Sequence, residues 1–581
     1  MENQKLEDVF NLSLDATAQE RAKSLQLDVG YLEQESRWEL IVKHNRTLEP
    51  LNGPLIQVEE LIAGYAIVTL PENLIASFTE LPEVEYVEKP KRLYFSTLEG
   101  KRASCIPEVT IREPYLTGKG VLLAVLDSGI DYTSPEFIDA GGKTRIRYLW
   151  DQTRTPQAGE YPPPGFSQGV LYTGEKINEA LQSIRPQDIV PSVDSSGHGT
   201  AVTTIAAGNG NSMDGQFQGV ATQADLLIVK IGNAMPNSFP KTTELMRALT
   251  FSVRTALEMG MPLVINLSFG NTYGSHDGTS LLERFLDNIA EIGRTVVCVG
   301  SGNEGASGGH VSGNFETKAN TIRRVELNVG RYQPSFSVQI WKEYTDDFAI
   351  RMRSPGEQEI LLQATYAGAL RYQLENTNLL IYQGEPSPYS VRQEIYIDFI
   401  PVDSYVNYGS WEFLLEPRQI VEGSFDFYLP SSTVLSSDTR FFSPTPDKTL
   451  TIPSTASKVI TVGAYDVVTN AYADFSGRGA GIQAPKQKPD IVAPGVQIST
   501  LAPGGIPVMV SGTSFATPFV SGAAALLMEW GIEKGNDAFL YGEKVKAYLR
   551  RGAAQIRGES EYPNNRAGWG ALCVAKSIPG G

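Results

Sequence analysis

The run Val121-Leu122-Leu123-Ala124-Val125-Leu126 contains no polar residue and is followed directly by Asp127. A half-exposed strand would alternate apolar and polar residues, so this run predicts a parallel strand that is buried on both faces. Two further apolar runs, at residues 226–230 and 263–267, have the same character. Helical patterns alternate with these strands, at residues 200–207, 242–259 and 281–292. Strands that alternate with helices predict an α/β fold with a parallel sheet.

Two other regions, residues 1–96 and 313–446, depart from this pattern. The first predicts a small α+β domain, with helical periodicity at 5–28, Thr17 and Glu20 at capping-box spacing, strands at 38–43, 64–70 and 84–95, and a helix at 71–81. The second has short alternating segments between turn residues, which is typical of a β-sandwich or jelly-roll. Because the α/β pattern returns after it, we expect the jelly-roll to be inserted into an α/β domain of residues 97–312 and 447–581.

The formal net charge of the 581-residue chain is −17. Surfaces that bind nucleic acid or anionic membranes are usually basic, so we expect no nucleic acid and no membrane as partner. The charge could favour cationic substrates, or it could serve solubility alone. The chain begins Met1-Glu2-Asn3-Gln4-Lys5-Leu6, without a basic segment followed by an apolar one. We therefore expect no signal peptide, no transmembrane helix, and an intracellular protein or one exported by a route that the sequence does not reveal.

The three cysteines are Cys105, Cys298 and Cys573. An odd and small number of cysteines does not imply a disulfide framework. Cys298 lies in the apolar run Thr295-Val296-Val297-Cys298-Val299, so we interpret it as a small core residue rather than a nucleophile.

Two residues with catalytic chemistry stand at the ends of predicted elements. Asp127 begins the motif Asp127-Ser128-Gly129 directly after a buried strand, where open parallel sheets gather functional groups. An aspartate there can orient a histidine, although an ordinary turn aspartate gives the same pattern. His198 lies between two glycines, which permit close backbone approach, and is expected at the first turn of a predicted helix. A capping or core histidine is the alternative.

Two further motifs suit acyl transfer. Ser514, in Ser511-Gly512-Thr513-Ser514, lies at the start of a helix that contains Pro518 near its beginning. Backbone N–H groups at a helix start are free to face negative charge, although many serines there are simply N-caps. Asn303, in Gly300-Ser301-Gly302-Asn303, follows another apolar strand. Its amide could donate to a developing oxyanion, or the segment could be a plain Gly-Asn turn.

These four motifs occur in the order that subtilisin uses for its Asp, His and Ser. Over residues 118–312 and 447–581 the sequence therefore resembles the subtilisin-like serine proteases. The resemblance implies a serine endopeptidase in which Ser514 is the nucleophile and His198 is the general base and then the general acid. Asp127 would orient the histidine, and the Asn303 side chain and the Ser514 backbone N–H would bind the oxyanion.

The same resemblance implies the substrate-binding residues. Ser268, Phe269 and Gly270 match the strand that pairs with the substrate backbone, and Ser301 and Gly302 would line the S1 pocket. A pseudoprotease or regulatory binding protein with the same fold is the main alternative. A serine esterase is disfavoured, because its G-x-S-x-G pattern is absent around the predicted nucleophile.

Residues 1–96 resemble the prodomain of these enzymes, a chaperone and inhibitor. Autocleavage is then expected at Phe95, Ser96 or Thr97, with the bond after Ser96 favoured; a permanent N-terminal module is the alternative. The prodomain, the absence of a visible signal peptide and the jelly-roll insertion resemble the Csp-type proteases of clostridial spore germination, which process a cortex-lytic pro-enzyme. This resemblance implies a cytoplasmic or spore-associated monomer whose partners are a protein or peptide substrate and its own retained prodomain.

The loop at residues 209–219 departs from the calcium-binding loop that is usual in this family. Asn209, Asn211 and Asp214 could supply oxygen ligands, but a solvated loop explains them as well. We therefore expect no metal and no other cofactor.

Overall fold

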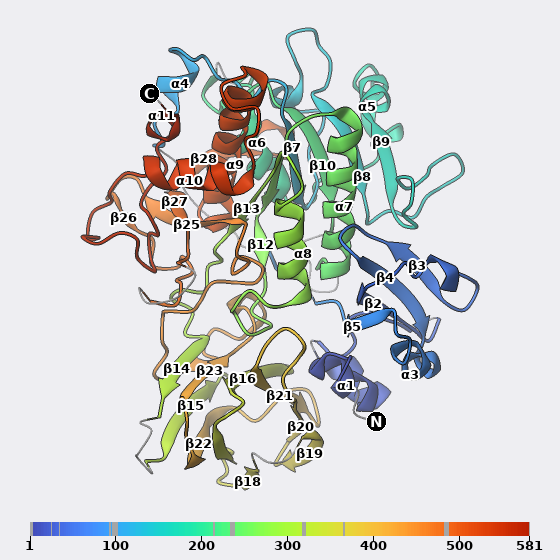
Figure 1. Cartoon of the computed structure of the whole chain (residues 1–581), viewed down its shortest axis with the longest axis vertical. Helices are drawn as coiled ribbons and strands as arrows, with labels where there is room; N and C mark the ends of the chain where they lie inside the picture. The colour runs from blue at the N-terminus through green and yellow to red at the C-terminus, as the bar shows by residue number, and fades with distance from the viewer. Residues whose placement is uncertain are drawn as a thin grey trace. The chain divides into compact units, whose positions relative to one another are not determined.

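The computed structural model describes residues 4–24, 26–33, 35–91, 94–95, 103–212, 215–232, 239–315, 321–363, 367–481 and 487–579. The chain divides into two compact units. The first, here called the β-rich unit, comprises Met1–Arg92, Asn271–Leu281 and Ala306–Ile452. The second, here called the α/β unit, comprises Leu93–Gly270, Leu282–Gly305 and Pro453–Gly581. Figure 1 follows the chain through both units by colour.

The α/β unit is built on a mostly parallel sheet, whose order is β26-β25-β13-β11-β7-β10-β8-β9, with β27 beside β25. Its parallel strands are β7 (Leu122–Asp127), β8 (Ile146–Asp151), β10 (Asp225–Lys230), β11 (Leu263–Leu267), β13 (Thr295–Gly300), β25 (Ile460–Asp466) and β27 (Ile491–Pro494). Two antiparallel strands lie at the edges, β9 (Val170–Thr173) and β26 (Ala471–Tyr472). Every residue of β7 is buried, so the prediction of a parallel strand covered on both faces is confirmed.

Four helices pack on this sheet or continue from it: α6 (His198–Ala207), α7 (Thr242–Met259), α8 (Leu281–Ala290) and α9 (Thr513–Met528). All residues of α9 are buried, and it contacts β11, β13, β25 and β27. Small residues permit its close approach to α6, because a Cβ on Gly522 would lie 2.8 Å from the Ala206 carbonyl oxygen. By length and composition the segment Thr513–Glu533 could cross a membrane, but 89% of its most apolar stretch is buried, as is typical of a core helix.

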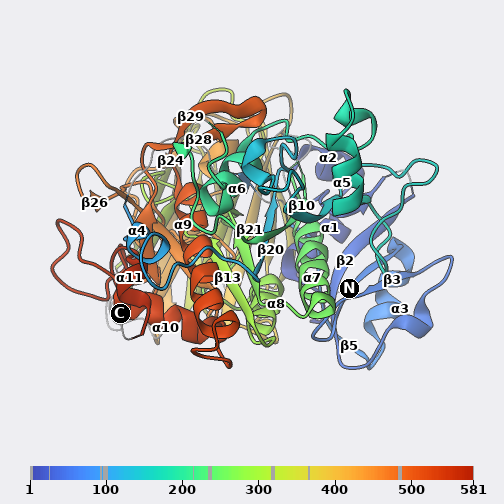
Figure 2. The same cartoon turned by 90° about the horizontal axis from the view of Figure 1, so that it is seen from above.

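The α/β unit also contains further α-helices and β-strands outside this sheet. They are α4 (Pro107–Thr110), α5 (Gly174–Leu181), α10 (Gly542–Gly552), α11 (Val574–Ser577), β6 (Tyr94–Phe95), β12 (Phe269–Gly270), β28 (Ile498–Ala502) and β29 (Ile506–Val510). Strands β28 and β29 form a hairpin that packs beside α6, as Figure 2 shows from above.

The α/β unit also contains a disulfide that the sequence did not predict. Cys105 and Cys573 are joined, although 468 residues separate them in the chain. Cys298 is the free and buried cysteine, as predicted. Counting three cysteines therefore misled the sequence interpretation, because one pair is linked and the odd residue is in the core.

The β-rich unit begins with an α+β domain of residues 4–91, called the N-terminal domain below. Its elements are α1 (Asp8–Asp15), α2 (Ala18–Lys23), α3 (Ile75–Thr79), β1 (Tyr31–Leu32), β2 (Arg37–His44), β3 (Gln57–Glu60), β4 (Tyr65–Pro71) and β5 (Val84–Glu88). The capping box of Thr17 and Glu20 is confirmed at the start of α2. The single helix predicted over 71–81 is wrong, because Pro71 ends β4 and a 3₁₀ turn, Glu72–Leu74, precedes α3.

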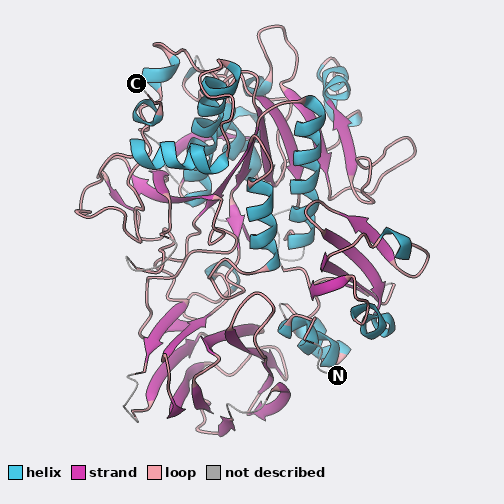
Figure 3. Ribbon diagram, in the orientation of Figure 1, coloured by secondary structure: helices cyan, strands magenta, loops and turns pink. Residues whose placement is uncertain are grey.

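The rest of the β-rich unit contains two antiparallel sheets that share one core. The first has the order β14 (His310–Asn314), β23 (Ser424–Tyr428), β16 (Phe336–Glu343), β21 (Arg392–Pro401), β20 (Thr377–Gln383) and β19 (Gly368–Leu374). The second has the order β18 (Glu359–Leu362), β17 (Asp347–Arg353), β22 (Gly409–Gln419), β15 (Arg323–Val329) and β24 (Arg440–Phe441). Their inner faces meet through side chains such as Phe399 and Trp411, whose ring centroids are 5.0 Å apart. Figure 3 shows by colour that strands and loops dominate this β-sandwich, which also contains a 3₁₀ turn at Ser432–Val434.

Candidate active site

Asp127 and His198 form a buried pair in the α/β unit. Asp127 is the last residue of β7, and His198 is the first residue of α6. Their atoms Asp127 Oδ1 and His198 Nδ1 are 2.7 Å apart, and both side chains are almost completely buried. Gly197 precedes the helix with a φ of +75°, and a Cβ on Gly199 would collide with the carbonyl oxygen of Gly129. The two flanking glycines therefore let the histidine approach the aspartate.

A second acidic residue, Asp194, fixes the start of α6. The Asp194 Oδ1 atom accepts hydrogen bonds from the Ser128 hydroxyl at 2.8 Å and the Gly197 N–H at 2.9 Å. Its Oδ2 atom accepts from the N–H and the hydroxyl of Thr200, both at 2.8 Å. Asp194 therefore ties the β7 turn to the helix that carries His198. Sequence reasoning missed this role, although an acidic residue just before a predicted helix was a usable signal.

Ser514 is the second residue of α9, which places it in the first turn of a buried helix. Its hydroxyl donates to the Ser268 carbonyl oxygen at 2.8 Å, and the Ser268 hydroxyl donates to the Ser514 carbonyl oxygen at 2.9 Å. The next residue, Phe515, has its ring centroid 5.2 Å from that of His198. The serine therefore lies between the histidine helix and residue 268, and its hydroxyl must leave the Ser268 carbonyl before a base can take its proton.

Asn303 is held in one orientation by the residue before the serine. Its Oδ1 atom accepts from the Thr513 N–H at 3.0 Å and from the Thr513 hydroxyl at 3.1 Å. These two bonds fix the orientation of the amide, whose Nδ2 group is its only donor. The Ser514 N–H lies in the first turn of α9, where backbone N–H groups have no partner within the helix. The two groups form a candidate oxyanion hole.

The segment that the sequence predicts to bind substrate is already paired. Strand β12 contains Phe269 and Gly270 and pairs antiparallel with β6, so that Phe95 lies opposite Phe269. An extended chain on this strand is the arrangement that a peptide substrate would use. Of the three residues predicted at the autocleavage site, Ser96 and Thr97 lie outside the described residues.

The predicted S1 residues follow β13 directly. Ser301 is fully buried, and its hydroxyl is 3.2 Å from that of Ser476. The Gly302 carbonyl oxygen accepts from the Gly477 N–H at 2.9 Å. Residues 476 and 477 therefore hold the predicted S1 residues Ser301 and Gly302 in place. They come from a distant part of the chain, so sequence reasoning did not find them.

The loop that was considered for calcium is organised by an acidic side chain. Glu136 is fully buried, and its two carboxylate oxygens accept from the Gly210 N–H at 2.7 Å and the Ser212 N–H at 2.9 Å. These backbone N–H groups face a carboxylate, whereas a cation would require oxygen atoms. The Asn209 and Asn211 amide groups both donate to the Ile138 carbonyl oxygen. Asp214 lies outside the described residues.

A buried ion pair supports the segment before β27. The Lys488 ammonium donates to the Val459 carbonyl at 2.7 Å, the Thr461 hydroxyl at 2.8 Å and the Asp490 carboxylate at 2.7 Å. Burial lowers the pKa of Lys488 to about 7, and the surrounding cations hold the pKa of Asp490 below its usual range despite its burial.

Burial also raises the pKa of the Cys298 thiol, so this cysteine is not a nucleophile.

Comparisons with known proteins match two parts of the chain to family models. Residues 4–91 match the family model of the Csp protease B prodomain, and residues 118–337 and 434–570 match that of the subtilase family. The structure of the CspB protease of Clostridium perfringens is similar, with a TM-score of 0.75 and 36% sequence identity, and the match covers 82% of this chain and 96% of that one.

Two curated proteins of Bacillus subtilis (strain 168) are also similar. Serine protease AprX is 35% identical over 153 residues, which are 23% of this chain and 32% of AprX. Minor extracellular protease Vpr is 23% identical over 562 residues, which are 90% of this chain and 61% of Vpr. The chain thus spans less than two thirds of the length of either protein.

Proposed function

Since this chain belongs to the subtilase family and carries a Csp-type N-terminal domain, we propose that it is a serine endopeptidase that cuts peptide bonds through an acyl-enzyme. The observation that carries this proposal is the buried pair of Asp127 and His198, at 2.7 Å, beside a serine at the start of α9.

Each residue has a role that follows from its position. The Ser514 hydroxyl leaves the Ser268 carbonyl and attacks the substrate carbonyl carbon, while His198 takes its proton. Asp127 accepts from His198 Nδ1–H and stabilises the imidazolium that forms. The negative charge that develops on the substrate oxygen is bound by the Asn303 amide and the Ser514 N–H. His198 then gives the proton to the leaving amine, and a water molecule hydrolyses the acyl-enzyme in the same way.

We further propose that the enzyme cuts its own chain after the N-terminal domain. The pairing of β6 with β12 supports this proposal, because it aligns Phe95 with the strand predicted to bind substrate. The bond after Ser96 would then follow within one residue of the paired segment.

The cleaved N-terminal domain should stay bound, because it packs on the β-sandwich within the β-rich unit. A buried apolar cluster joins the two through Val9, Leu12, Ala16 and Leu27 on one side and Leu380, Tyr382, Tyr396 and Ile400 on the other. The valine, leucine and isoleucine side chains in this cluster each contribute about 1.5–3 kcal/mol when fully buried. Lys23 adds hydrogen bonds to the carbonyl oxygens of Pro401 and Val402, at 3.0 and 2.8 Å. These contacts are made by residues 9–27, so cleavage next to residues 95–97 would leave them intact.

Buried acidic groups line the same contact. Lys91 pairs with Glu7 at 2.8 Å and with Glu88 at 2.7 Å, and Glu394 of the β-sandwich accepts from the Gln339 amide at 2.5 Å. Burial, reinforced by the Glu7 carboxylate, raises the pKa of Glu394 to about 8. A buried cluster with more carboxyl groups than cations is stable only while some of the carboxyl groups are protonated. Retention of the cleaved N-terminal domain should therefore depend on pH.

By its likeness to the Csp proteases we propose a pro-enzyme of spore germination as substrate, and a monomeric, cytoplasmic or spore-associated enzyme. The proposed reaction uses acid–base and nucleophilic side chains only, and we propose no metal or other cofactor for it.

The test compares purified wild type, Ser514→Ala and the control Ser77→Ala, which changes an exposed serine of α3. We expect a serine-directed fluorophosphonate to label wild type and Ser77→Ala, and a chromogenic peptide to be hydrolysed by both. Ser514→Ala should show neither. A wild-type chain that is neither labelled nor active after removal of its N-terminal domain would instead favour a regulatory binding protein.

A further inference from the structure

Three tyrosines gather at one end of the β-sandwich, in the β15–β16 and β21–β22 loops. Tyr332 is 73% exposed, Tyr405 is 47% exposed and Tyr408 is 60% exposed. The rings of Tyr332 and Tyr405 are nearly perpendicular, at 75°, with centroids 5.5 Å apart. The Arg331 guanidinium lies over the Tyr408 ring, 5.3 Å from its centroid. These residues line one pocket, called the tyrosine pocket below.

The β21–β22 loop, which carries Tyr405 and Tyr408, is held in place by hydrogen bonds of Asn407, although the rings are exposed. Asn407 Oδ1 accepts from the Asn376 N–H and the Thr377 hydroxyl, both at 2.8 Å. Its Nδ2 group donates to Glu375 at 2.6 Å, and its carbonyl oxygen accepts from the Trp411 indole N–H at 3.0 Å. Ordered loops that hold aromatic rings in solvent lose little conformational entropy on binding a partner.

Tyr332 also has a strained backbone. Its φ is +61°, in the left-handed region that a bulky side chain adopts at a cost of about 1–2 kcal/mol. Glycine or asparagine would occupy this position without that cost. A bulky aromatic residue that is both strained and exposed gains nothing for the fold, which points to selection for a function.

We propose that the tyrosine pocket binds a proline-rich, extended segment of a partner protein. At about 200 Å² per tyrosine the exposed rings offer about 360 Å². A stable interface between folded proteins buries about 800 Å² per partner, so this pocket fits a short peptide segment better than a domain surface. Proline-rich segments in the polyproline II conformation dock on aromatic-lined grooves.

The free polar groups of the pocket agree with this ligand. Among the described residues, the hydroxyls of the three tyrosines have no hydrogen-bond partner in the chain, and all can donate. A polyproline II segment presents unpaired carbonyl oxygens and, at each proline, no N–H. A saccharide would need amide side chains to hold pairs of its hydroxyls, but the Asn407 and Asn376 amides donate within the loops.

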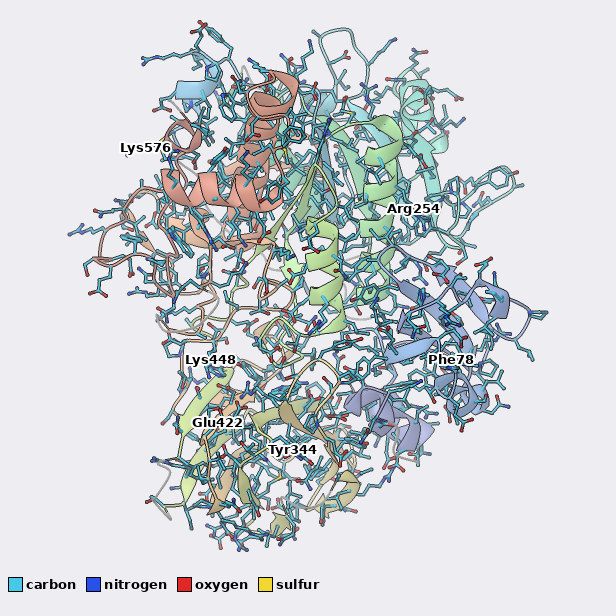
Figure 4. All side chains as sticks on the ribbon, viewed as in Figure 1. Phe78, Arg254, Tyr344, Glu422, Lys448 and Lys576 are labelled. Carbon is cyan, nitrogen blue, oxygen red and sulfur yellow. A yellow bond between two sulfur atoms is a disulfide. The ribbon has the colours of Figure 1, made fainter. Side chains whose placement is uncertain are left out.

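The experiment uses the full-length Ser514→Ala chain, so that the peptide is not cut. Fluorescence anisotropy of a labelled decamer of L-proline measures binding. We expect saturable binding that Tyr332→Ala and Tyr405→Ala each weaken about tenfold, as expected for aromatic anchors. The control is Tyr344→Ala, another exposed tyrosine of the β-sandwich, which is labelled in Figure 4 and should bind as the parent does.

A second variant separates loss of the ring from misfolding. Tyr332→Gly removes both the ring and the strain, so its melting temperature should be equal to or above that of the parent while binding falls. No binding of the decamer up to millimolar concentration, or equal binding by all variants, would overturn the proposal. So would binding of chitotetraose in its place, or self-association of the chain in sedimentation that the two alanine variants abolish.

Discussion

Replacing Asn303 by leucine should reduce kcat of peptide hydrolysis by about 10²–10³, with little change in KM. The structure gives the reason, because the N–H and hydroxyl of Thr513 hold the Asn303 oxygen at 3.0 and 3.1 Å and so fix the orientation of the Nδ2 group that would donate to the oxyanion. A donor to an oxyanion that exists only in the transition state affects kcat and not ground-state binding. The corresponding loss is about 2.7–4 kcal/mol.

Thr513→Val should cause a smaller loss of kcat than Asn303→Leu. It removes one of the two hydrogen bonds that orient the amide, worth about 1 kcal/mol, and should lower kcat about fivefold. The assay is initial-rate hydrolysis of a peptide p-nitroanilide by processed enzyme, with circular dichroism as a check of folding. The reasoning is refuted if Asn303→Leu changes KM rather than kcat, or if Thr513→Val is the more damaging of the two.

Three further predictions concern stability, pH and the triad. Cys105→Ser should lower the thermal midpoint in calorimetry, because in the chain-entropy treatment closing the 468-residue span to Cys573 restricts the unfolded chain by up to about 6 kcal/mol; an unchanged midpoint would contradict it. Burial raises the pKa of Glu394 to about 8 while the N-terminal domain is docked on the β-sandwich. When the domain separates, Glu394 returns to a pKa of about 4.5 and releases its proton above that pH. Retention of the cleaved N-terminal domain in gel filtration should therefore be strongest near pH 4.5, weaken steadily as the pH rises toward 8 and change little above it, and Glu394→Gln should flatten this dependence. Asp127→Asn should lower kcat about 10⁴-fold without unfolding the chain, because His198 loses the carboxylate that orients it; a smaller effect than that of Thr513→Val would count against the assigned role.

Sequence reasoning reached the elements that local physics determines. An apolar run such as β7 must be covered on both faces, which predicts a central strand of a parallel sheet. A motif that directly follows this strand lies at its carboxyl end, so the sequence alone was enough to place Asp127 there. The helix starts at His198 and Thr513 follow from the flanking glycines in the same way.

Features that depend on distant contacts were beyond such reasoning. The disulfide of Cys105 and Cys573 and the bracing of Ser301 by Ser476 join segments whose proximity no local pattern encodes. The role of Asp194 depends on where Ser128 lies in space. The break at Pro71 was missed because a proline at a helix start and a proline at a strand end look alike in sequence.

The most direct test of the account is intact mass and N-terminal sequencing of the purified wild-type chain beside Ser514→Ala. The account predicts that wild type is cut next to Phe95, Ser96 or Thr97, and that Ser514→Ala remains uncut. If both chains stay whole, or both are cut alike, Ser514 does not cleave its own chain, and the proposed self-processing protease is contradicted.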